Sequence, residues 1–218
     1  MRLVSFVCAA LALAAVPALA QDPVKVASSN YTVIAENERV RVLRASMAPG
    51  GKAAMHEHPV HLFVSLAAGT VKMTTGDGKT IDTVMKADDV GLQPAGLHAT
   101  ANAGTGPIEV VIVEMKGAPG SATLPATRPG MKATTVLDDA RVRAVRASFE
   151  PTFHEAAGST HEYDQVVVML APADVALTLD GKTTSSWKRG DVRLISRGQA
   201  HETHAGKMAG DVMIISVK

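Results

Sequence analysis

The sequence contains the same pattern twice, and this duplication constrains the fold more than any other feature. The segment RVRVLRASMAP, which begins at Arg39, recurs as RVRAVRASFEP from Arg141, and seven of the eleven positions are identical. DGKT at 77–80 recurs at 180–183, and KADDV at 86–90 recurs as KRGDV 102 residues later. Because the matches keep their order at a nearly constant offset, we expect two domains of roughly 90 residues each rather than a series of short repeats.

A segment rich in glycine and proline separates the two copies. It reads GAPGSATLPATRPG and covers residues 117–130, a composition typical of a linker. We therefore place the first domain at residues 30–117, the linker at 118–130 and the second domain at 131–218.

The first twenty residues have the composition of a secretory signal. Arg2 gives a short positive region, residues 3–16 are apolar, and an Ala-Leu-Ala sequence at 18–20 is a cleavage signature. The apolar run is too short for a membrane-spanning helix, so we expect a cleaved signal peptide over residues 1–20 and a periplasmic or secreted protein. The one cysteine, Cys8, lies inside this segment, so the mature protein is expected to contain no disulfide.

Within each copy, apolar residues recur with a period of two rather than 3.6. Short β-branched or alternating runs are found throughout, namely VRVLRASM, HLFVSLAAGTVKMTT, EVVIVEM and VVVMLA. The Asp-Gly pairs at 77–78 and 180–181 are typical of hairpins, in which a type I′ turn needs positive φ at both central residues. The sequence therefore predicts an all-β protein whose domains are closed sandwiches or barrels.

Charge and aromatic content narrow the choice of partners. The chain has 22 Lys and Arg against 21 Asp and Glu, and 3% of its residues are aromatic. This balance indicates no basic surface for nucleic acid or an anionic membrane, and few side chains on which bases could stack. We expect a small-molecule partner, no nucleic acid and no membrane insertion after signal cleavage, and we leave open a homo-oligomer.

Three of the eight histidines lie within six positions, in the stretch MHEHPVHLF. His56 and His58 are two residues apart, so on a strand their side chains point to the same face. His98 follows a Pro-x-Gly turn some forty residues later, and a strand there that faces the first pair would add a third nitrogen ligand for a metal ion. The alternative is three core histidines without a metal, each of which needs a hydrogen-bond partner when it is buried.

This spacing resembles that of the cupin family, and specifically of tandem two-domain cupins. The residues that fit the two cupin motifs are Gly50, His56, His58 and Gly69 in the first, and Pro94, Gly96, His98 and Asn102 in the second. One residue rather than two separates Gly96 from His98, as in a group of small cupins, some of which are labelled as β-alanine degradation proteins. The resemblance implies two tandem jelly-roll β-barrels, with a divalent metal ion held by His56, His58 and His98 in the first.

One ligand of the family pattern is missing. The position at which cupins carry a glutamate is Leu62. Strict alternation from His56 points Leu62 into the barrel and His61 outward, so we expect Leu62 to add apolar wall and His61 to have a structural or surface role. A bulge near Pro59 would instead bring His61 inward as a ligand.

The second copy keeps fewer of these residues. His161 matches the second histidine of the pair, Gln165 takes the glutamate position, and His201 matches the second motif, whereas a serine replaces the first histidine. His161, Gln165 and His201 are therefore weaker metal candidates. His154 or Glu162 are further donors outside the family spacing, and we expect this domain to have lost its metal.

A site of three neutral imidazoles leaves a divalent ion with its full positive charge, so it favours anionic ligands. Three protein ligands also leave coordination positions open, which suits catalysis or ligand capture. Three functions follow: an oxidoreductase of the dioxygenase type acting on a small anionic molecule, as in some three-histidine cupins; a non-catalytic module that binds a small molecule or a metal; and a structural protein. The residues do not distinguish Fe, Mn, Zn and Ni.

Overall fold

The computed structural model describes residues 21–125, 128–207 and 210–218, which are folded almost entirely as β-sheet. The predicted signal peptide, residues 1–20, lies outside the described residues. A single short helix, α1 (Pro23–Val26), precedes the first strand, and Asp22 caps it by accepting a hydrogen bond from the Val24 amide. Among the described residues, no helix has the length and apolar character needed to span a membrane.

Nine strands form the first half of the molecule. They are β1 (Tyr31–Glu36), β2 (Val40–Met47), β3 (Lys52–His58), β4 (His61–Ser65), β5 (Gly69–Thr75), β6 (Thr80–Met85), β7 (Val90–Gln93), β8 (Gly96–Asn102) and β9 (Ile108–Met115). They make a five-stranded sheet of order β1-β2-β9-β4-β7 and a four-stranded sheet of order β3-β8-β5-β6. Every pairing is antiparallel.

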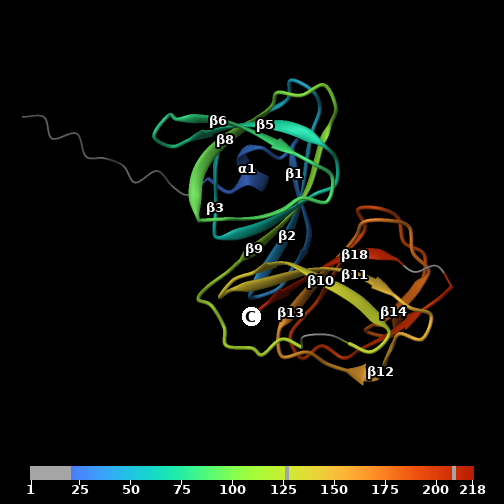
Figure 1. Cartoon of the computed structure of the whole chain (residues 1–218). Coiled ribbons are helices and arrows are strands. Elements are labelled where there is room, and N and C mark those ends of the chain that lie inside the picture. The colour runs from blue at the N-terminus through green and yellow to red at the C-terminus, as the bar shows by residue number, and fades with distance from the viewer. Residues whose placement is uncertain (1–20, 126–127, 208–209) are drawn as a thin grey trace, which may run out of the picture.

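The second half repeats this arrangement strand for strand. Its strands are β10 (Met131–Asp138), β11 (Val142–Phe149), β12 (His154–Ser159), β13 (Asp164–Met169), β14 (Val175–Leu179), β15 (Lys182–Thr184), β16 (Val192–Ile195), β17 (His201–Ala205) and β18 (Asp211–Val217). Their sheets have the orders β10-β11-β18-β13-β16 and β12-β17-β14-β15. The prediction of an all-β chain with two similar barrel-like halves is therefore confirmed, and Figure 1 shows the halves in blue to green and in yellow to red.

Both Asp-Gly pairs lie in hairpin turns, but the two turns differ. Asp180 and Gly181 have φ of 49° and 74°, as a two-residue type I′ turn requires, and they connect β14 directly to β15. In the first half Gly78 has φ of 83°, whereas Asp77 is not in the left-handed region. The prediction of a type I′ turn at 77–78 is therefore wrong. The Gly78 amide bonds to the Thr75 carbonyl at 2.8 Å, which makes a longer loop that ends in a left-handed glycine.

The largest apolar cluster of the molecule lies between the two halves. The five-stranded sheet of each half contributes fully buried side chains to this interface cluster, which include Val42, Leu62 and Val111 from the first half and Val166 and Ile215 from the second. Each half also has a separate core between its own two sheets. Because apolar burial is the main favourable term in folding, the two halves stabilise each other.

An ion pair between a buried carboxylate and a partly exposed arginine lies at the edge of the interface. Asp164 on β13 is 1% exposed and accepts hydrogen bonds from Arg39 Nε at 2.9 Å and from Asn37 Nδ2 at 2.8 Å. The Arg197 amide also donates to Asp164 at 3.0 Å. A carboxylate with three donors is compensated for its loss of water, so this contact orients one half relative to the other.

Candidate metal centre

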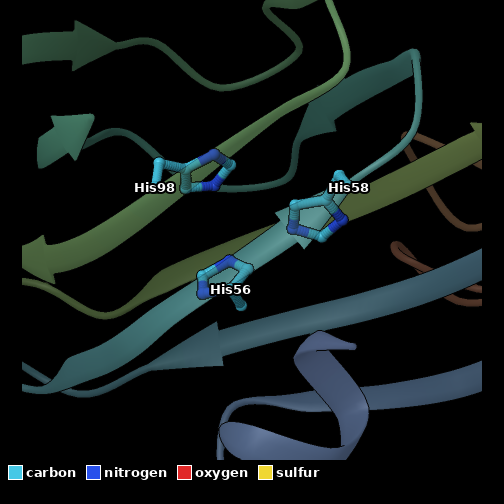
Figure 2. A group of neighbouring side chains, drawn as sticks. All are labelled: His56, His58 and His98. Carbon is cyan, nitrogen blue, oxygen red and sulfur yellow. The ribbon is translucent and has the colours of Figure 1, made fainter. Parts of the chain in front are cut away.

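Strands β3 and β8 bring together the three histidines of the predicted metal site. The two strands are antiparallel neighbours in the four-stranded sheet, and His56 is directly paired with His98. The strand of His98 therefore lies beside that of His56 rather than opposite it. His56 and His58 share a face of β3, and one nitrogen from each of the three rings lies within 4.8 Å of the others. Figure 2 shows the three rings gathered over these two strands.

Hydrogen bonds orient two of the rings. His56 Nδ1 lies 2.6 Å from the Ala54 carbonyl, and His58 Nδ1 lies 2.6 Å from Oε1 of Glu114. Because both partners accept only, each Nδ1 carries the proton and each Nε2 keeps a free lone pair. His56 Nε2 is buried without a hydrogen-bond partner in the described part of the chain. A buried polar atom without a partner is costly, and a metal ion would satisfy it, so the donor set fits a divalent transition metal.

Glu114 on β9 is a residue of this centre that the sequence reasoning missed. It is 1% exposed, and Arg41 Nε donates to its Oε2 while Arg41 also binds Asp22 at 2.6 Å. Burial opposes ionisation of Glu114, but the bonds from His58 and Arg41 outweigh it and lower the pKa of the carboxyl. A carboxylate that holds the far nitrogen of a metal-ligating histidine fixes its tautomer and raises its basicity. The available signal was that Glu114 is one of two carboxylates in the otherwise apolar run IEVVIVEM.

Two ligands of the centre, His56 and His98, favour their neutral form. Burial, together with the neighbouring imidazoles of His56 and His58, lowers the pKa of His98 to about 3. Burial likewise lowers the pKa of His56. Because a metal binds the deprotonated nitrogen, these rings are available as ligands at neutral pH without first losing a proton.

The expectation that His61 points outward and Leu62 inward is wrong. His61 is 6% exposed and lines the cavity beside the centre, with its ring centroid 4.7 Å from that of His58. Leu62 instead lies in the interface cluster. The physical reason is that β3 ends at His58 and the chain crosses to the other sheet at Pro59, where alternation starts again in β4. Burial lowers the pKa of His61 to about 4, so it is a fourth neutral imidazole next to the triad.

A cavity of about 410 Å³ opens beside the triad. His58, His61 and His98 form its polar end. The rest of its wall is mostly apolar, with Met47, Phe63, Val71, Met73, Met85 and Ile112 among the lining residues. Among the described residues, none that lines the cavity is Lys, Arg, Asp or Glu, so a ligand in this cavity meets imidazoles at one end and an uncharged wall elsewhere. Cavities of this size and character suit small organic molecules.

The second half holds a different cluster from the one that its sequence indicates. His161 and His201 are brought together, with ring centroids 4.6 Å apart, and their third neighbour is Glu155. Gln165 is buried, but its side-chain oxygen accepts a hydrogen bond from Arg128 at 3.0 Å. The two other suggested donors, His154 and Glu162, are exposed.

The interior of the second half is nearly filled. Phe149, Phe153 and Trp187 pack in its core, and the remaining cavity measures about 30 Å³. Trp187, the single tryptophan of the sequence, is 4% exposed and donates to the Val175 carbonyl at 2.6 Å. A space of 30 Å³ holds about one water molecule, so among the described residues the interior of the second half leaves no room for an organic ligand.

Comparison with known proteins agrees with this architecture. Residues 43–114 match the Cupin domain family model, whereas a search of curated proteins gave no match. Among solved structures, a Cupin 2 conserved barrel domain protein from Leptotrichia buccalis is 13% identical, with a TM-score of 0.60 over 86% of this chain and 88% of that one.

Two further similar structures are of salicylate 1,2-dioxygenase. The enzyme from Pseudaminobacter salicylatoxidans is 12% identical, with a TM-score of 0.59 over 82% of this chain and 70% of that one. Its adducts with gentisate give 13% and 0.59 over 82% and 68%. Such low identities establish the fold alone. Residues 43–114 thus match the cupin domain, and the described chain has the fold of two tandem cupin barrels.

Proposed function

We propose that the chain binds one divalent metal ion through His56, His58 and His98, and that this centre catalyses a dioxygenase-type oxidation of a small molecule. The observation that carries the proposal is the convergence of three imidazoles at the end of a cavity of about 410 Å³. Similar solved structures include a dioxygenase, and one of them contains gentisate, which supports this reaction class by analogy of fold.

The metal would supply open coordination positions and a positive charge that three neutral ligands leave intact. Glu114 accepts a hydrogen bond from Nδ1 of His58 and so holds the Nε2 atom of this ring toward the centre. The apolar wall around Met73 and Met85 excludes water from the bound molecule. Because the described lining contains no cationic side chain, only the metal at the histidine end would hold a negatively charged group. The substrate class that we propose is therefore a small anion whose charged group lies at this end and whose remainder is apolar.

The same cavity favours a second candidate function, capture of a small molecule or metal without turnover. The observation in its favour is that, among the described residues, the cavity lining offers no Asp, Glu or Lys that could act as a general acid or base beside the imidazoles. We further propose that the protein works outside the cytoplasm, in the periplasm or as a secreted protein, on the strength of the signal-like residues 1–20.

Oxygen consumption separates the two candidates. The mature chain would be purified without a histidine tag, loaded anaerobically with Fe²⁺, Mn²⁺, Zn²⁺ or Ni²⁺, and mixed with salicylate, gentisate and a panel of small aliphatic carboxylates in an oxygen electrode. Uptake that needs Fe²⁺ or Mn²⁺ and is lost in His98→Ala supports the oxidoreductase. Calorimetric binding of a panel member without oxygen uptake under any metal supports capture, and the absence of both contradicts the proposal.

A further inference from the structure

The second barrel contains three side chains that could bind a metal, Glu155, His161 and His201, and they lie close together without forming hydrogen bonds to one another. His201 Nε2 lies 3.4 Å from Oε2 of Glu155, and His161 Nε2 lies 3.8 Å from Oε1. Both nitrogens are buried and lack a hydrogen-bond partner in the described part of the chain. Two imidazoles and one carboxylate form a donor set that divalent iron, zinc and cobalt accept.

An arginine from the linker lies against this cluster. Arg128 Nη1 donates to Oε1 of Glu155 at 2.7 Å, and Nη2 donates to the Tyr163 hydroxyl at 2.6 Å and to Gln165 at 3.0 Å. The Arg128 side chain is 15% exposed. Three directed bonds hold a guanidinium firmly because its planar fork is pre-organised, so the linker is anchored in the barrel at this residue.

Arg128 also separates the interior of the barrel from its surface. It lines both the inner cavity of about 30 Å³ and an outer hollow of about 510 Å³, and Phe153 and Glu155 line both as well. The guanidinium therefore lies between the outer hollow and the inner cavity, where it is bonded to Glu155 of the cluster. In the first barrel, no arginine or lysine lines the cavity beside the triad.

Charge makes this position unfavourable for a metal ion. Arg128 is permanently charged and already neutralises the one carboxylate of the cluster. A divalent ion at Glu155 would lie a few ångströms from that charge, where repulsion is strong in a partly buried setting.

We propose that Arg128 is a built-in cation that closes a metal site formed by Glu155, His161 and His201, and that this second site binds a divalent transition metal when the guanidinium is withdrawn. The site differs from the sequence expectation because Glu155, rather than Gln165, supplies the oxygen donor. This role of Arg128 also explains how a barrel can retain two clustered histidines and still exclude a metal ion.

The test measures zinc binding in a His56→Ala, His98→Ala background, so that the first barrel does not contribute and the result is independent of the proposed function. In this background, Arg128→Gln is compared with three other proteins. They are the parent that retains Arg128, the Arg128→Lys variant that keeps the positive charge, and a variant that combines Arg128→Gln with Glu155→Gln. We expect Arg128→Gln to bind about one additional Zn²⁺ per chain, at least about tenfold tighter than its parent. Arg128→Lys should stay near the parent, and the Glu155 replacement should abolish the gain.

A second variant provides the same test if Arg128→Gln does not fold. Tyr163→Phe removes one of the three bonds to Arg128 and keeps the ring, so it should tighten zinc binding in the same direction by a smaller factor. Emission of Trp187, which is buried in the second barrel, reports whether each variant is folded. Two results overturn the proposal: no gain in zinc affinity in either Arg128→Gln or Tyr163→Phe, or Glu155-dependent zinc binding by the parent that equals that of Arg128→Gln.

Discussion

Replacing Glu114 by glutamine tests how the first barrel prepares its ligands. The carboxylate offers two oxygens to two donors: His58 Nδ1 bonds to Oε1 and Arg41 Nε bonds to Oε2. Glutamine has nearly the same shape but a single oxygen, so one of the two donors must face an NH₂ group instead. The bond to His58 is 2.6 Å long between side chains that are each 1% exposed, and at such a site water does not screen or replace the lost interaction.

The expected effect is on metal affinity. Removal of a carboxylate that orients a metal-ligating histidine typically weakens binding about 10- to 100-fold, or about 1.4–2.7 kcal/mol. Zinc affinity would be measured by competition with a chromophoric chelator in wild type, Glu114→Gln and the matched control Glu57→Gln. Glu57 lies between two of the ligands in sequence, but alternation places it on the opposite face of β3. Equal zinc affinities for Glu114→Gln and wild type, within about threefold, would refute this reasoning.

Three further outcomes are expected. As pH falls from 6.5 toward 4, the metal-free protein should lose stability to urea, because His61 and His98 take up protons in the unfolded chain but stay neutral in the folded one, where their pKa values are about 4 and about 3. If the unfolding free energy of a His61→Gln, His98→Gln variant depends on pH as steeply as that of wild type, this reasoning is contradicted. Leu62→Ala should cost about 2–5 kcal/mol of unfolding free energy without weakening metal binding, since Leu62 lies in the interface cluster; a loss of metal with no loss of stability would place Leu62 in the cavity. Asp164→Asn should destabilise the chain by about 1–3 kcal/mol in denaturant titrations, because Arg39 and Asn37 lose a charged acceptor; an unchanged midpoint would show that the pair does not orient the halves.

Much of the architecture could be predicted because the duplication and the period of two are local properties of the sequence. Two similar halves with identical strand orders follow from them. The convergence of His56 and His58 likewise needs only alternation within one strand. The spacing of the second cupin motif predicted His98 as the third ligand. The register of β3 against β8 then sets its ring beside that of His56.

What the sequence did not reveal depends on contacts between distant segments. The reversal of His61 and Leu62 arises where the chain changes sheets at Pro59, and simple alternation does not include such a change. Glu114 on β9 contacts His58 on β3 although 56 residues separate them in the sequence.

The second barrel depends on distant contacts in the same way. Glu155 reaches His201 through the pairing of β12 with β17, which contains an irregularity between Glu155 and Ser159. The sequence did not indicate that Arg128 contacts the second barrel, because its segment has the composition of a linker.

The most direct test of the account is the metal content of the first barrel. The tag-free mature chain and its His56→Ala, His98→Ala variant would be equilibrated with Fe²⁺, Mn²⁺, Zn²⁺ or Ni²⁺, freed of loose ions by gel filtration and examined by elemental analysis. We predict about one ion per chain in wild type and almost none in the variant. Less than about 0.2 ion per wild-type chain with every metal, or equal content in the two proteins, would contradict the account.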